Sequence, residues 1–86
     1  MYTIETGKEV RKFLVKHPEI AERYVDKTIV IQNNPHHPEG VDVKPYIGHP
    51  WHYRMRIGKY RFLYEVIDDQ ILVYFYEADS RGDVCR

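Results

Sequence analysis

Residues 52–65 limit most strongly what this chain can fold into, because they have the pattern of two β-strands joined by a tight turn. Gly58-Lys59 lies in the middle of this segment. Glycine at the first position of a two-residue loop is typical of the type II′ turn, whose twist matches that of antiparallel strands. With this loop, Arg56 on the first strand pairs with Arg61 on the second. The segment therefore predicts a β-hairpin with a defined register.

This register separates the hairpin into two faces, because side chains alternate across a strand. One face is apolar and belongs on a hydrophobic core; it consists of Tyr53, Met55, Ile57, Tyr60, Phe62 and Tyr64. The other face, termed the arginine face, carries His52, Arg54, Arg56, Arg61, Leu63 and Glu65. Two arginines directly opposite each other repel by a few tenths to about 1 kcal/mol, so folding alone does not explain Arg56 and Arg61. A multiply charged anion would relieve the repulsion.

The residues before the hairpin predict a short strand followed by two helices. Residues 1–5 alternate weakly and fit an edge strand. The segment Thr6-Gly7-Lys8-Glu9 fits a capping box, in which the Thr6 hydroxyl caps a helix that ends before Pro18. A second helix is expected from Pro18 to Gln32, where apolar residues recur at helical spacing. The apolar stripe of this helical hairpin can cover the apolar face of the strands.

The remaining segments predict a long loop and a third strand. Prolines and glycines are dense in residues 33–51, which excludes a long helix or strand there. After a turn within residues 68–70, the β-branched and aromatic residues 71–76 predict a strand. Its alternation places Tyr74 and Tyr76 on the arginine face. The sequence thus predicts an α+β fold, with an N-terminal strand and a helical hairpin packed on one face of an antiparallel β-sheet.

Length and composition favour one small domain over residues 1–86. Thirteen Lys and Arg offset thirteen Asp and Glu, but residues 45–64 contain four cations and no acid. A local basic patch of this kind can steer phosphate on a neutral protein. The single cysteine, Cys85, excludes an internal disulfide, and the adjacent His36-His37 side chains point apart, which disfavours a metal site. No apolar run approaches the ~18 residues of a membrane span, so a cytoplasmic protein is expected.

The polar and aromatic residues gathered on the arginine face suit single-stranded RNA. Guanidinium groups bind phosphate bidentately, and aromatic rings stack on unpaired bases. Arg81 follows just past the end of the third strand and would lie beside this face. The alternative is that the arginines form the solvated face of a half-exposed sheet, paired with Glu65 and nearby acids.

Two segments resemble the RelE/ParE superfamily of type II toxins. Residues 53–69, YRMRIGKYRFLYEVIDD, resemble its central hairpin, in which a basic strand is followed by a G-x-Y-R strand. Ser80-Arg81-Gly82-Asp83-Val84 resembles its C-terminal R-x-D/E-V-Y segment, although Cys85 stands where tyrosine is usual. With the order of strand, helical hairpin and three strands, the resemblance covers nearly the whole chain.

The resemblance implies an RNA-binding hydrolase that inhibits translation. RelE-type enzymes are described as metal-free endoribonucleases, or mRNA interferases, that enter the ribosomal A site, where the 2′-hydroxyl of the mRNA attacks the adjacent phosphate. The expected partners are the ribosome, mRNA and a cognate antitoxin, with no cofactor, no membrane and no direct DNA binding without the antitoxin. The alternative is a ParE-like toxin that binds and poisons DNA gyrase without hydrolysing anything.

The resemblance also assigns roles by position. Arg54 and Arg56 match the basic pair of the first catalytic strand, and Arg61 and Arg81 match the arginines that stabilise the phosphate. Arginine is a poor base, with a pKa above ~12, so His52 is the better proton acceptor by chemistry. The predicted catalytic residues are therefore Arg56, Arg61, Arg81 and His52, and the predicted RNA-binding residues are Arg54, Lys59, Tyr74 and Tyr76.

Overall fold

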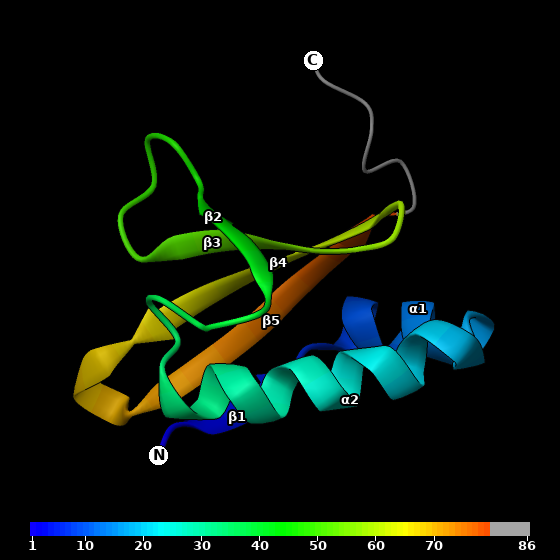
Figure 1. Ribbon diagram of the computed structural model, residues 1–86, viewed down its shortest axis with the longest axis horizontal. Coiled ribbons are helices and arrows are strands. Elements are labelled where there is room, and N and C mark those ends of the chain that lie inside the picture. The colour runs from blue at the N-terminus through cyan, green and yellow to red at the C-terminus, as the bar shows by residue number, and fades with distance from the viewer. Residues whose placement is uncertain (80–86) are drawn as a thin grey trace.

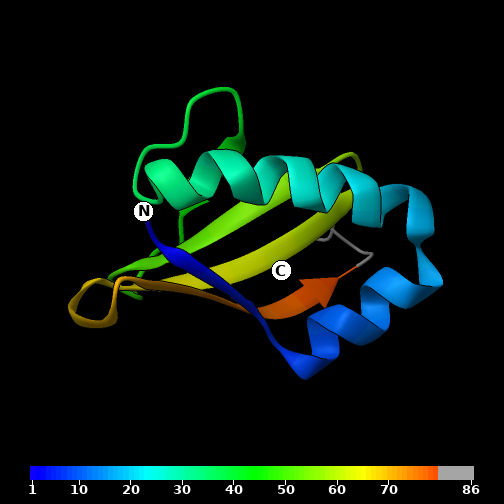
Figure 2. The same ribbon diagram turned by 90° about the horizontal axis from the view of Figure 1, so that it is seen from below.

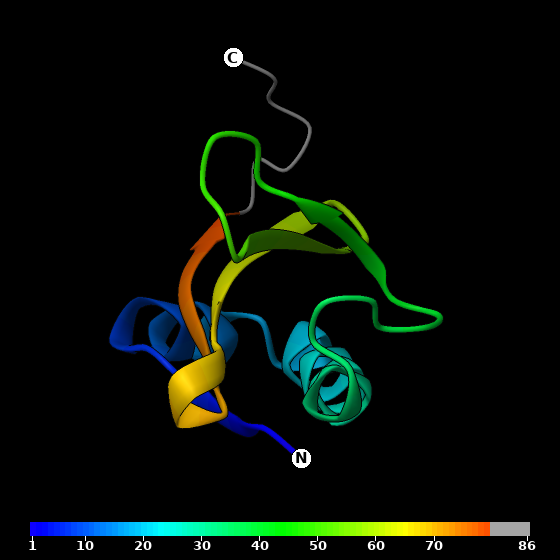
Figure 3. The same ribbon diagram turned by 90° about the vertical axis from the view of Figure 1, so that its left-hand side faces the viewer.

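The computed structural model describes residues 1–79 as two helices and a five-stranded sheet with the order β1-β5-β4-β3-β2 (Figure 1). The elements are β1 (Thr3–Thr6), α1 (Lys8–Lys16), α2 (Pro18–Asn33), β2 (Asp42–Pro45), β3 (His52–Ile57), β4 (Tyr60–Ile67), the 3₁₀ turn η1 (Asp68–Gln70) and β5 (Leu72–Asp79). The predicted α+β fold is confirmed. Figures 2 and 3 show both helices on one face of the sheet, so the opposite face has no helical cover.

The sheet is antiparallel from β2 through β5, which the sequence predicts for β3, β4 and β5; β2 lies in the segment predicted to be loop. The N-terminal strand differs, because β1 lies parallel to β5 and makes the whole sheet mixed. Its attachment is extended by two backbone hydrogen bonds, from Tyr2 N–H to Gln32 O and from Thr3 N–H to Ile71 O, both 2.9 Å. This edge strand therefore joins the end of α2 to the start of β5.

The central hairpin has the predicted register, with Arg56 opposite Arg61. Gly58 has a φ of +61° and Lys59 has no positive φ, which is the combination that the type II′ turn requires. The following connection is longer than predicted, because Ile71 also adopts a left-handed conformation after η1. The loop of residues 68–71 still contains an even number of residues, so the strand alternation is the one that the sequence predicts.

The hydrophobic core lies between the helices and the apolar face of the sheet. Phe62, Tyr64 and Phe75 are fully buried there, and the rings of Phe62 and Phe75 lie 5.3 and 5.1 Å from the ring of Tyr24 on α2. The Tyr64 hydroxyl donates to the carbonyl oxygen of Pro35 at 2.8 Å. The arginines of the opposite face are half-buried or exposed, so the predicted assignment of the two faces is confirmed.

The predicted capping box at the start of α1 is wrong. The N-cap is Gly7 and makes no side-chain cap hydrogen bond, while Thr6 still belongs to β1 and its hydroxyl bonds to that of Tyr24 at 2.8 Å. A tertiary contact therefore uses the side chain that the local pattern assigned to the helix. Gly7 donates to Phe75 O at 2.8 Å, and a Cβ at Gly7 would lie 2.9 Å from the same oxygen, so the close strand contact requires glycine.

Candidate functional site

The arginine face is the side of the sheet that carries no helices, and three strands supply its side chains. Strand β3 provides His52, Arg54 and Arg56, β4 provides Arg61, and β5 provides Tyr74 and Tyr76. The structure thus brings together six of the residues that the sequence predicts for the site. Lys59 does not join them, because its ammonium lies 5.7 Å from the ring centroid of Tyr60, on the apolar side of the hairpin. Arg81 and Cys85 lie outside the described residues.

A row of four charged residues crosses the face at the level of the two opposed arginines. The paired positions run Asp42, Arg56, Arg61 and Asp79 over β2, β3, β4 and β5. Arg61 Nη2 lies 3.5 Å from Asp79 Oδ2, and both side chains are about three-quarters buried, with 25% and 23% exposed. We term this the charged row. The Asp79 carboxylate offsets part of the repulsion between the arginines, and Asp42 lies opposite Arg56 by register; from the sequence, nearby acids were considered only as the alternative to an RNA site.

A β-bulge brings Asp79 into this row. The register shifts between Leu63 and Tyr64, so that Leu63 pairs with Glu77 and Tyr64 with Phe75. Tyr76 is the extra residue in β5, and beyond it the alternation of the strand is reversed. Without the shift, Glu77 would fall on the core face; with it, Ala78 packs against the core and Asp79 reaches the arginine face.

The next level of the face contains two cations, Lys44 and Arg54, whose side chains form no ion pair within residues 1–79. Arg54 pairs in register with Lys44 on β2 and with Leu63 on β4. Within residues 1–79, the Arg54 side chain makes no hydrogen bond or ion pair, and the residue is half-buried. Lys44 is exposed and was missed by sequence reasoning, because β2 lies in a segment that was predicted to be loop. This level therefore has two adjacent positive charges on β2 and β3, with Glu77 on β5 beyond Leu63.

His52 is held by two partners on neighbouring strands. Its Nδ1 lies 2.8 Å from the Tyr76 hydroxyl, and its Nε2 lies 3.8 Å from Glu65 Oε2. Burial, followed by the charges of Glu77, Tyr46 and Glu65, raises the pKa of Tyr76, so this phenol keeps its proton at neutral pH. When Tyr76 donates to Nδ1, the neutral imidazole carries its own proton on Nε2, facing Glu65. Both ring nitrogens thus have a partner: Glu65 faces a proton on Nε2, and the Tyr76 hydroxyl can donate to Nδ1 in the neutral ring or accept from it in the imidazolium.

No family model matches the sequence, and no curated protein matches it. Solved structures, in contrast, do match this chain. The archaeal RelE in the RelE–RelB complex from Pyrococcus horikoshii has a TM-score of 0.82 and 26% identity over 96% of this chain and 98% of that chain. RelE in the RelB–RelE complex from Methanococcus jannaschii has a TM-score of 0.71 and 26% identity over 92% of each chain.

The isolated Escherichia coli RelE toxin has a TM-score of 0.75 and 21% identity, over 91% of this chain and 82% of that chain. The chain has a RelE-like toxin fold. The resemblance to RelE that the sequence predicts is therefore confirmed. None of the helices in residues 1–79 is long and apolar enough to cross a membrane.

Proposed function

We propose that this RelE-like chain is the toxin of a type II toxin–antitoxin system and that it cleaves mRNA on the ribosome. The observation that carries the proposal is the arginine face itself. Arg54, Arg56 and Arg61 lie together on the one sheet face that the helices leave uncovered, within a fold that matches RelE toxins over nearly the whole described chain. A strand of RNA can lay its phosphates along such a face.

The proposed reaction is attack of the 2′-hydroxyl of the mRNA on the adjacent phosphate. It needs an in-line geometry, stabilisation of the charge on the phosphorane, a proton acceptor and a proton donor to the leaving 5′ oxygen. Arg61 supplies charge stabilisation, since within residues 1–79 its side chain contacts only Asp79, through Nη2, and its other N–H donors can meet phosphate oxygens. Arg54 and Arg56 position the strand, and Arg81 is assigned to the same phosphate by the resemblance alone.

His52 is proposed to transfer the proton through Nε2. As an imidazolium, it donates from Nδ1 to Tyr76 and presents the Nε2 proton to the substrate, which suits protonation of the leaving oxygen. To act as the acceptor, as the sequence predicts, His52 must carry its proton on Nδ1, with the Tyr76 hydroxyl turned to accept it. Tyr76 is then a positioning residue in either role, and Glu65 favours the donor role.

The antitoxin is proposed to mask this face. The similar structures from P. horikoshii and M. jannaschii are complexes of RelE with RelB. We infer a cognate antitoxin whose segment fills an apolar groove of this small domain and whose acidic side chains oppose Arg54 and the charged row. Because the ribosome is the proposed target, the toxin is placed in the cytoplasm.

One observation favours the second candidate, a ParE-like toxin that poisons DNA gyrase. The charged row pairs Arg61 with Asp79 and places Asp42 beside Arg56, which lowers the positive potential available for RNA. Single-turnover cleavage of mRNA on programmed ribosomes separates the two candidates. Cleavage by the wild type supports the nuclease, whereas intact mRNA, together with DNA damage in cells that express the chain, supports the gyrase poison.

A further inference from the structure

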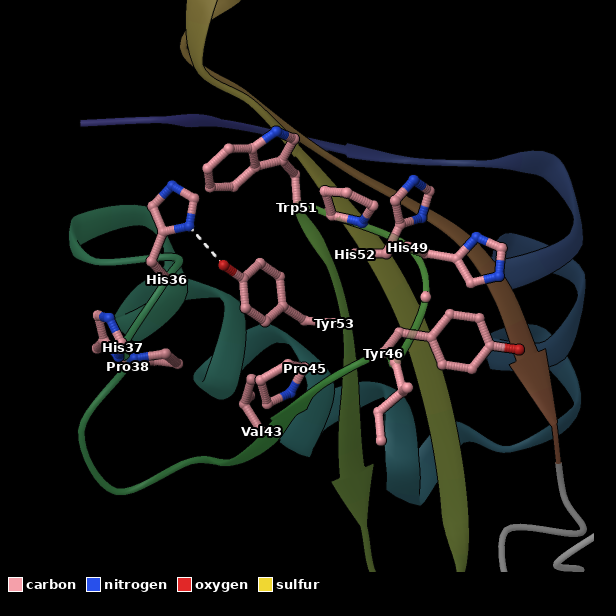
Figure 4. Close-up of a pocket in the computed structure, with 13 residues that line it drawn as sticks. His36, His37, Pro38, Val43, Pro45, Tyr46, His49, Trp51, His52 and Tyr53 are labelled. Carbon is pink, nitrogen blue, oxygen red and sulfur yellow. Dashed lines mark hydrogen bonds between the residues drawn. The ribbon is translucent and has the colours of Figure 1, made fainter.

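A cavity of about 900 Å³ lies between the loop that follows α2 and the loop that joins β2 to β3 (Figure 4). Its lining is dominated by flat rings: His36, Tyr46, His49, Trp51, His52 and Tyr53. No Lys, Arg, Asp or Glu is among the residues that line it in the described part of the chain. Stacking surfaces with neutral hydrogen-bonding edges suit an aromatic heterocycle better than a phosphate.

Contacts among the lining residues, and one with Asp68, hold several of these rings in place. His36 bonds through Nδ1 to the Tyr53 hydroxyl at 2.6 Å and through Nε2 to Asp68 at 3.2 Å. Tyr46 and His49 stack on each other, with ring centroids 4.9 Å apart and an interplanar angle of 17°. Figure 4 shows the His36–Tyr53 pair and the Tyr46–His49 pair on opposite sides of the cavity. Its walls are therefore ordered by the protein before any ligand arrives.

Trp51 has a backbone conformation and an exposure that packing of the core does not explain. Its φ is +68°, which is rare for a bulky side chain, and its side chain remains 60% exposed instead of joining the core. The backbone is fixed by the Val66 N–H, which donates to Trp51 O at 2.9 Å. Strained residues of this kind cluster at binding sites, where the surrounding structure maintains them for a role other than packing.

His52 connects this cavity to the arginine face, because its ring lines the cavity and bonds to Tyr76 on that face. We propose that the cavity binds one nucleobase of the same RNA strand whose phosphates lie on the arginine face, with the base stacked on Trp51. This inference rests on the proposed function and deepens it, since it makes the cavity a determinant of which nucleotide lies beside the cleaved bond.

The chain contains one tryptophan, so its tryptophan fluorescence reports on Trp51 alone. We would titrate the free protein with 2′-O-methyl RNA trinucleotides, which lack the attacking hydroxyl, and follow tryptophan fluorescence. The intact trinucleotide should quench Trp51, and an abasic ribose at one position should abolish the quenching and weaken binding roughly 5- to 150-fold, the range for loss of one stacked base. Equal binding and no quenching difference at all three positions would overturn the proposal.

Fluorescein-labelled trinucleotides allow the same measurement on variants by anisotropy. Trp51→Ala should weaken binding by the same roughly 5- to 150-fold, and Trp51→Phe, which keeps a ring, should largely restore it. Ile71→Ala is the matched control, since Ile71 is also apolar, also exposed and also at positive φ, but does not line the cavity. An effect of Trp51→Ala on antitoxin binding alone would instead assign the cavity to a protein side chain.

These outcomes are independent of catalysis. If the base causes quenching but the wild type cleaves no mRNA on ribosomes, the nuclease proposal is refuted and the base site is supported. If the wild type cleaves mRNA but its RNA binding does not depend on the base, the base site is refuted and the nuclease proposal is supported.

Discussion

Replacement of Arg61 by alanine tests the proposed chemistry most directly. Arg61 lies opposite Arg56 and, within residues 1–79, contacts Asp79 through Nη2, so its other N–H donors can meet a phosphate whose charge grows in the proposed transition state. Loss of one preorganised donor to such a charge costs ~2.7–4 kcal/mol, or ~10²–10³ in rate. We expect single-turnover cleavage of mRNA on programmed ribosomes to slow by that factor.

The same change should leave the fold almost unaffected. A partly exposed ion pair such as that of Arg61 and Asp79 is worth ~0–1 kcal/mol, and relief of the repulsion from Arg56 returns a few tenths to ~1 kcal/mol. The two effects have opposite signs, so the free energy of unfolding should change by less than ~1 kcal/mol. For a domain of this size, that corresponds to a change in Tm below roughly 8 °C.

The control for net charge is Lys12→Ala, which removes one exposed cation from α1 on the opposite side of the sheet. This variant should cleave at the wild-type rate, and Arg61→Lys should recover only part of the rate because it lacks the guanidinium fork. Undiminished cleavage by folded Arg61→Ala would refute the role of Arg61. A fall in rate matched by a loss of several kcal/mol in unfolding free energy would show that the residue acts on folding instead.

Three further changes probe the fold and the charged row. Tyr64→Phe leaves the buried Pro35 carbonyl without its donor, and urea unfolding should show a loss of ~1–3 kcal/mol. The hydrogen bond from Tyr2, and after it that from His36, lowers the pKa of Asp68 below its ordinary 3.8. In thermal unfolding, the wild type should therefore be more stable than Asp68→Asn. The whole difference should be present above pH 3.8 and should disappear as the pH falls through the lowered pKa. Asp79→Asn should tighten RNA binding up to ~5-fold in anisotropy, while the single-turnover rate at saturation stays the same.

Much of the fold could be predicted because its determinants are local in the sequence. The Gly58-Lys59 turn fixes the hairpin register, and the register fixes which side chains face the core. The prediction for the start of α1 was wrong because a tertiary contact replaced the local one: the Thr6 hydroxyl bonds to Tyr24 instead of capping the helix. The parallel pairing of β1 with β5 joins the two ends of the described chain, and no local pattern encodes it.

The candidate site was predicted on β3 and β4 but not at its margins. The acids of the charged row, Asp42 and Asp79, come from the strands on either side of the hairpin and reach it only through strand pairing. One signal for the bulge was present, because Glu77 breaks the core alternation that Val73 and Phe75 establish. The cavity beside Trp51 could not be read from the sequence, since two separate loops form it.

Under the proposed function, electrostatics predicts different roles for the two levels of the arginine face, one in binding and one in catalysis. Lys44 and Arg54 lie side by side on β2 and β3, and the acid of their row, Glu77 on β5, is separated from Arg54 by Leu63, so we expect the two cations to attract a phosphate of the ground state. Arg61 already contacts a carboxylate, and exchanging Asp79 for a phosphate of similar charge gains little. As the phosphorane accumulates charge, the exchange becomes favourable, so this contact strengthens mainly in the transition state. Only such differential stabilisation raises the rate of a chemical step, so under the proposed function we expect the charged row to limit ground-state binding while it preserves the contribution of Arg61 to catalysis.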